Sequence, residues 1–174
     1  MKLVITGIPG SGKTTLAKAL ATKLGVEYVD LNAVAKKFAV KKKTGKEFEI
    51  NLKKLQSVVT KILRGKKAFI VDGHLAAEIK IPCDLVVILR CNPRVLMKRL
   101  QKRKYNEKKI IDNALAEAQD YFSLKVEENY GKKFIEVDST RVISASKLLF
   151  LISHRKSTKI NWGKELLWFA SQGL

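Results

Sequence analysis

Residues suited to holding phosphate stand near the start of the chain, in the stretch GIPGSGKTT at positions 7–15. Its spacing fits G-x-x-x-x-G-K-[ST], in which glycines let the backbone turn its N–H groups toward a polyphosphate. Lys13 would then reach the β- and γ-phosphates, and the Thr14 hydroxyl would bind Mg²⁺. An ordinary glycine-rich turn is the alternative. The stretch predicts an ATP site with Mg²⁺ at Gly10, Gly12, Lys13, Thr14 and Thr15.

A second set of candidate residues follows the apolar run at 68–71. An acid directly after such a run commonly orients water around the nucleotide's Mg²⁺, so Asp72 is predicted to contribute to the metal site through water. Capping of the next turn is the alternative. His74 lies two residues on, and in an extended chain it projects from the same face as Asp72. A neutral imidazole there would orient or deprotonate water, although a structural role stays open.

Three arginines form a third set, at positions 94, 99 and 103. Arg99 and Arg103 are four residues apart, on one face of a predicted helix and just before a short polar segment. Phosphoryl transfer spreads negative charge over the equatorial oxygens, and a guanidinium brought in by a closing loop stabilises that charge. A solvated basic helix end is the alternative interpretation.

Alternating strands and helices are expected to position these residues. Strands are predicted at 2–6, 27–31, 68–73, 84–90 and 133–138, and helices at 16–24, 93–102, 107–129 and 144–154. The Lys-rich region 32–67 is expected to form two or three helical pieces broken near Thr44 and Gly45. Apolar strands separated by helices indicate an α/β fold with a parallel sheet covered on both faces. Ligands bind at the carboxyl ends of such strands, where the stretch at 7–15 lies.

Length and composition fit one domain over residues 1–174. The sequence has no run of eighteen apolar residues and no signal-peptide pattern, so we expect a soluble intracellular protein with no membrane partner. The two cysteines, Cys83 and Cys91, are too few for a four-thiolate zinc site and are interpreted as core residues.

The charge of the chain is strongly positive. Lys and Arg number 35 against 16 Asp and Glu, for a formal net charge of +19. Such a surface attracts polyanions, and beyond a nucleotide the obvious polyanion inside a cell is nucleic acid. Lysine enrichment for solubility or for a hot environment is the alternative.

Four stretches of the chain together resemble the small adenylate kinase-like proteins of archaea and the eukaryotic nucleus. They are the phosphate-binding stretch, VDGH at 71–74, the run at 84–90 and, above all, RKYNEKKI at 103–110. The resemblance covers roughly residues 1–140. It implies a three-layer α/β/α P-loop NTPase fold like that of nucleoside monophosphate kinases, with a five-stranded parallel sheet. It also implies a mobile monophosphate-binding part near 30–53 and a short lid near 102–112.

The resemblance also carries expectations about function. It implies a broad-specificity nucleoside monophosphate kinase (ATP + AMP to 2 ADP) that is also an ATPase, located in the cytoplasm or, in a eukaryote, the nucleus. Members assist late maturation of the small ribosomal subunit by binding ribosomal protein uS11. Asp72 and His74 match the family's Asp-x-His, and Arg103 matches its lid arginine that contacts ATP. Catalysis is accordingly expected from Lys13, Asp72, His74 and Arg103.

Two positions depart from the family pattern. Lys104 stands where a glycine is usual, which would stiffen the lid. Residues 32–63 contain no arginine, so Lys36, which aligns with the family's arginine, is the candidate for holding the acceptor phosphate. A lysine is a point charge and does not grip a phosphate bidentately.

Three functions stay open at this point. One is the monophosphate kinase, and a second is an ATPase assembly factor whose kinase activity is incidental. His74 favours hydrolysis in addition to transfer, because water needs orienting whereas an ionised monophosphate does not. A small-metabolite kinase is the third, and it needs an acceptor-side base that residues 32–63 do not offer. The tail at 157–174 is expected to form a helix packed back on the sheet, with an exposed contact surface as the alternative.

Overall fold

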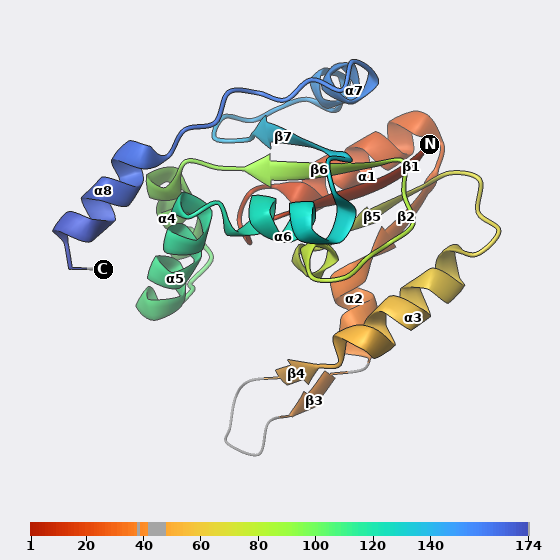
Figure 1. Ribbon diagram of the computed structural model, residues 1–174, viewed down its shortest axis with the longest axis horizontal. Coiled ribbons are helices and arrows are strands. Elements are labelled where there is room, and N and C mark those ends of the chain that lie inside the picture. The colour runs from red at the N-terminus through yellow and green to blue at the C-terminus, as the bar shows by residue number, and fades with distance from the viewer. Residues whose placement is uncertain (38, 42–47, 174) are drawn as a thin grey trace.

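A five-stranded parallel sheet forms the centre of the molecule (Figure 1). The computed structural model describes residues 1–37, 39–41 and 48–173. The strand order is β2-β5-β1-β6-β7. The strands are β1 (Lys2–Gly7), β2 (Glu27–Asp30), β5 (Phe69–Asp72), β6 (Leu85–Arg90) and β7 (Phe134–Asp138). This sheet confirms the predicted fold class, and each strand lies within a residue or two of its predicted bounds.

Helices cover both faces of the sheet, as apolar parallel strands require. On one face, α1 (Lys13–Leu24) and α7 (Ala145–Ser153) share a buried apolar cluster with the strands. On the other face, α3 (Leu52–Leu63) and α6 (Tyr121–Tyr130) pack with the short 3₁₀ helix η1 (His74–Ala77). The phosphate-binding stretch follows β1, the central strand, and therefore sits at the middle of the sheet's carboxyl edge.

A group of helices extends beyond the carboxyl ends of β6 and β7 (Figure 1). It consists of α4 (Pro93–Lys102), α5 (Glu107–Ala118) and α8 (Gly163–Ser171). The predicted packing of the tail on the sheet is wrong, because α8 packs against α5 instead. Its Phe169 is buried there, whereas Leu167 is 72% exposed.

The predicted all-helical structure of residues 32–67 is also wrong in part. The region begins with α2 (Leu31–Lys36) and ends with α3, but between them lies an antiparallel ribbon of β3 (Ala39–Lys41) and β4 (Phe48–Ile50). In β4 the apolar residues Phe48 and Ile50 flank the charged Glu49, a period of two that suits a strand and not a helix. The break expected at Thr44 and Gly45 lies outside the described residues.

The single helix predicted at 107–129 is two helices, α5 and α6. Asp120 separates them with a φ of 57°, a left-handed conformation that interrupts the helix. Its carboxylate accepts a hydrogen bond from the buried guanidinium of Arg90 at the end of β6. Among the described residues, no helix combines the length and the apolar character that crossing a membrane requires.

Candidate functional site

The phosphate-binding stretch has the backbone that its sequence predicts. Gly7 has a φ of 129°, and a Cβ there would lie 2.4 Å from the carbonyl oxygen of Leu89 on β6, so only glycine fits. Gly12, with a φ of 91°, is the N-cap of α1, and the positive end of that helix faces the loop. The loop is tied to β7, because the Ser139 hydroxyl donates to the Ser11 carbonyl at 2.8 Å.

Lys13 is buried beside this loop. Its Nζ donates to the Ile8 carbonyl oxygen at 2.9 Å. Burial lowers the pKa of Lys13 to about 8, the carboxylate of Asp72 opposes this fall, and the positive charge of Arg103 adds to it. A buried ammonium held near a second cation is suited to receive an anion, because an anion relieves both the desolvation and the repulsion.

Asp72 ends β5 directly opposite Lys13 and Thr14. Its Oδ2 accepts hydrogen bonds from the Thr14 hydroxyl at 2.6 Å and from the Tyr28 hydroxyl at 3.2 Å. Its Oδ1 is buried and has no hydrogen-bond partner among the described residues. Burial raises the pKa of Asp72, while Thr14 and Lys13 oppose that rise. A carboxylate oxygen with unused lone pairs beside a threonine hydroxyl fits the oxygen ligands and bound waters of Mg²⁺.

His74 reaches the site by a different route from the one predicted. The chain is not extended after Asp72, because Gly73 is followed at once by the 3₁₀ helix η1. The imidazole nevertheless lines the same cavity as Lys13. Burial, and then the charge of Lys13, lower the pKa of His74 to about 4. At neutral pH the ring is therefore uncharged and able to accept a hydrogen bond from water.

Lys13, Thr14 and His74 line one cavity of about 730 Å³, a size usual for small-ligand sites. It is lined by most of the predicted binding residues, namely Gly10, Gly12, Lys13, Thr14, Thr15, Lys36, His74 and Arg103. Six further lining residues were not predicted as site residues, namely Pro9, Asn32, Ala35, Ile50, Leu75 and Tyr105. The Oδ1 of Asn32 is buried without a partner among the described residues. Asn32 lies in the first turn of α2, just after the N-cap Asp30, and a polar residue at that place was the signal in the sequence that could have indicated it.

The three arginines do not act as one cluster. Only Arg103 lines the cavity. Arg99 is a structural clamp whose Nη2 donates to the carbonyls of Ser139 and Thr140 at 3.0 and 2.8 Å. Arg94 stacks on the Trp168 ring of α8, with 4.7 Å between its Cζ and the ring centroid.

A helix-capping motif fixes the backbone next to Arg103. Arg103 is the C-cap of α4. The N–H of Lys104 bonds to the Gln101 carbonyl at 2.9 Å, and the N–H of Tyr105 bonds to the Leu100 carbonyl at 3.2 Å. This is the Schellman pattern, which places the residue after the C-cap in the left-handed region. Lys104 accordingly has a φ of 58°, where glycine is the favoured residue.

We expect Lys104→Gly to be more stable than Lys104→Ala by about 1 kcal/mol, because only the alanine keeps a strained Cβ. Both variants lose the ammonium, so the comparison isolates the backbone. At exposed Lys18, inside α1, the order should reverse by a similar amount. Urea denaturation of the four variants measures both differences. A preference for alanine at both positions would contradict the strain at Lys104.

The fold and the site together define a protein with the P-loop kinase fold. Two solved structures share this fold over most of their length: a gluconokinase from Sinorhizobium meliloti 1021 (TM-score 0.59, 15% identity, 98% of this chain and 97% of that one) and a shikimate kinase from Bacteroides thetaiotaomicron (TM-score 0.55, 20% identity, 89% and 95%). At such low identity they show the fold alone.

The sequence comparisons are more specific. The family described as AAA domain matches residues 3–120. A protein of Methanocaldococcus jannaschii named "Putative adenylate kinase" is 32% identical over 170 residues, covering 93% of each chain. A protein of Pyrococcus abyssi with the same name is 40% identical over 140 residues, covering 80% of this chain and 76% of its own length. The chain therefore belongs to the AAA-domain family and to the same family as these archaeal relatives.

Proposed function

We propose that this protein is a nucleoside monophosphate kinase, which transfers the γ-phosphoryl group of ATP to a monophosphate such as AMP and also hydrolyses ATP. The observation that carries the proposal is the single cavity that Lys13, Thr14 and Arg103 line together with Lys36 and His74. The phosphate-binding stretch and Arg103 offer cations and backbone N–H groups for a triphosphate, and Lys36, on α2, offers a cation for an acceptor. The names of the relatives support the same activity.

The residues divide the chemical work between positioning and charge. An oxygen of the acceptor phosphate attacks the γ-phosphorus, the bond to the β–γ bridging oxygen breaks, and ADP departs with that electron pair. The acceptor is largely ionised at neutral pH, since its second pKa is about 6, and it therefore needs no base. Lys13 and Arg103 offset the negative charge of the transferring group. Thr14 directly, and Asp72 through water, would hold the Mg²⁺ that neutralises the phosphate oxygens.

The acceptor side of the cavity suits a monophosphate that is bound without a guanidinium. Lys36 provides a point charge for the phosphate, and Ala35, Ile50 and Leu75 provide apolar surface for the nucleobase of the acceptor. A lysine grips phosphate less tightly than a bidentate arginine. No acceptor-side carboxylate appears among the described cavity residues. A small-metabolite hydroxyl needs a base and would therefore have to rely on His74.

The biological setting that we propose is late maturation of the small ribosomal subunit, through binding of ribosomal protein uS11, with ATP turnover driving release. The resemblance of residues 103–110 to the nuclear and archaeal family supports this role, and the net charge of +19 suits contact with ribosomal RNA. Binding of purified uS11, compared with Mg-ATP and with Mg-ADP present, tests it. Equal affinity in the two nucleotide states would argue against a switching role.

The direct test of the enzymatic proposal uses purified protein with Mg-ATP, with and without AMP. ADP and inorganic phosphate are both measured. We expect ADP to form faster when AMP is added, with two ADP per ATP consumed and no matching release of phosphate. Phosphate release that is unaffected by AMP would instead identify an ATPase whose kinase activity is incidental.

Arg103→Ala should lower kcat by at least about 10²-fold while leaving the fold intact, since cationic groups at phosphoryl-transfer sites are worth several kcal/mol. The side chain is exposed, so its loss removes little packing. Steady-state kinetics with a thermal melt as the stability check give the answer, and Lys102→Ala, on the preceding exposed lysine, is the matched control. If only the salt dependence of RNA binding changes, Arg103 is part of a surface basic patch.

A further inference from the structure

Helices α4 and α5 form an antiparallel hairpin, and residues 103–106 are its tip. Arg103 and Tyr105 at this tip line the cavity. The base of the hairpin consists of the start of α4 and the end of α5, and α8 lies beside it in Figure 1. Tip and base are thus at opposite ends of the same two helices.

Apolar and cation–π contacts hold α8 against both helices of the hairpin. Phe169 is completely buried and clusters with Ala114 and Ala118 on the inner face of α5. The Arg94 guanidinium, in the first turn of α4, stacks on the Trp168 ring. The small side chains of α5 are what allow the Phe169 ring to approach so closely.

Hydrogen bonds add two anchors at the same end. The indole N–H of Trp162 donates to Glu117 Oε1 at 3.1 Å, and the Asn92 side-chain amide donates to Glu165 Oε1 at 2.7 Å. Asn92 is the N-cap of α4, and Glu117 lies in the last turn of α5. Each helix of the hairpin therefore has a polar contact and an aromatic contact to the tail.

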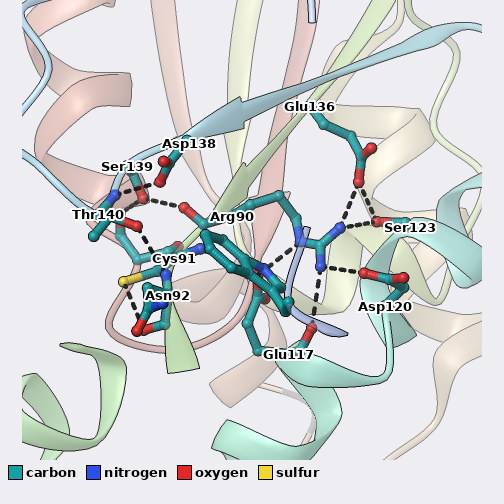
Figure 2. Close-up of polar contacts among 12 residues, drawn as sticks. Arg90, Cys91, Asn92, Glu117, Asp120, Ser123, Glu136, Asp138, Ser139 and Thr140 are labelled. Carbon is teal, nitrogen blue, oxygen red and sulfur yellow. Dashed lines mark hydrogen bonds and ion pairs between the residues drawn. The ribbon is translucent and has the colours of Figure 1, made fainter. Parts of the chain in front are cut away.

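Glu117 connects these anchors to the sheet. Its carboxylate is 1% exposed and accepts from Arg90 Nε at 2.7 Å and from the Cys91 N–H at 3.1 Å (Figure 2). Arg90 also pairs with Glu136 on β7 at 2.6 Å and with Asp120. A buried guanidinium with three carboxylate partners is fully compensated, and it fixes the end of β6 to the end of α5. Trp162 adds the tail to this network.

We propose that the segment Trp162–Phe169 braces the base of the α4–α5 hairpin and thereby sets the position of Arg103 over the phosphates. Trp162 and Phe169 are positioning residues in this arrangement, and the proposal rests on the kinase function proposed above. Arg103 is exposed at the tip and lines the cavity together with Lys13, so its distance from the phosphates depends on how the two helices are held at their other end. A displacement of about 1 Å is enough to cost up to about 10²-fold in rate.

A double-mutant cycle with Arg103 tests the brace. Phe169→Ala should lower kcat and weaken binding of a non-hydrolysable ATP analogue by about fivefold to tenfold, together with a lower Tm. Trp162→Phe keeps an aromatic ring but removes the indole N–H that donates to Glu117. It should lower kcat and analogue affinity less, by about threefold, with a Tm close to that of the wild type. In the Arg103→Ala background, neither substitution should cause a further loss beyond about twofold, because the group they position is already gone.

Three comparisons keep the test decisive. Phe169→Leu, which keeps most of the buried surface, should recover most of the rate, and Leu167→Ala on the exposed face of α8 should match the wild type. Losses that multiply with Arg103→Ala, or a lower Tm with unchanged kcat and analogue affinity, would show that α8 serves stability alone. If the wild type binds the analogue but shows no AMP-dependent turnover, the kinase function fails, and the cycle is then judged on analogue affinity.

Discussion

Lys13→Ala is expected to abolish both phosphoryl transfer and ATP hydrolysis. One ammonium serves the β- and γ-phosphates in either reaction, and no other lysine among the described cavity residues lies in the phosphate-binding stretch. In the present structure Lys13 Nζ donates to the Ile8 carbonyl, and it must exchange that bond for phosphate oxygens. The measurement is ADP and phosphate formation from Mg-ATP, with and without AMP.

A second substitution at the same position, Lys13→Met, separates loss of function from loss of fold. Because burial lowers the pKa of Lys13, its charge disfavours the folded state. Lys13→Met, which keeps the length without the charge, should therefore be inactive yet melt no lower than the wild type. Lys23→Ala, on the exposed side of α1, is the matched control and should remain fully active. Near-normal turnover by Lys13→Ala would contradict the assignment of Lys13 to the phosphates of a bound nucleotide.

His74→Ala should depress acceptor-independent ATP hydrolysis strongly, by about 10²–10⁴-fold, because that is the usual contribution of proton handling. The imidazole lines the cavity and is neutral at pH 7, so it can accept a hydrogen bond from water and orient it. Transfer to AMP should fall much less, since the acceptor arrives already ionised. The quantity to measure is the ratio of the two losses in one preparation, with thermal melting to check stability.

The chain's second histidine provides the control for this experiment. His154 is exposed at the end of α7, and His154→Ala should leave both reactions unchanged. Equal losses of hydrolysis and transfer in His74→Ala would mean that His74 positions the metal or the end of β5 and has no special role with water. Wild-type rates in both reactions would reduce His74 to a structural residue.

Short-range patterns were sufficient to predict the sheet and the centre of the site. The strands are continuous apolar runs, and the phosphate-binding stretch constrains its own backbone through Gly7 and Gly12, so both are encoded within a few residues. Asp72 could be placed because it ends such a run. In contrast, Tyr28 gained its place beside Asp72 from the pairing of β2 with β5, which no local pattern reveals.

The errors came where distant contacts override local preference. The helical pattern at 107–129 continues through Asp120, but the Arg90 guanidinium binds that carboxylate and the chain takes a left-handed turn. Phe169 of the tail is buried, but its partner is α5, where Ala114 and Ala118 leave room for it, and Leu166 and Leu167 stay exposed. Apolar periodicity indicates which face of a helix is covered but not what covers it.

The central position of β1 has a consequence for how the protein folds as it is synthesised. β1 is the first strand made, but its partners are β5 and β6, so Val4 pairs with Val71 and Val86. Pairings across such long stretches of chain are slow to form and wait for the later residues. A nascent chain that ends before Arg90 therefore contains the whole phosphate-binding stretch without the strands that shape it. The ability to bind nucleotide should appear abruptly, only after β6 has emerged.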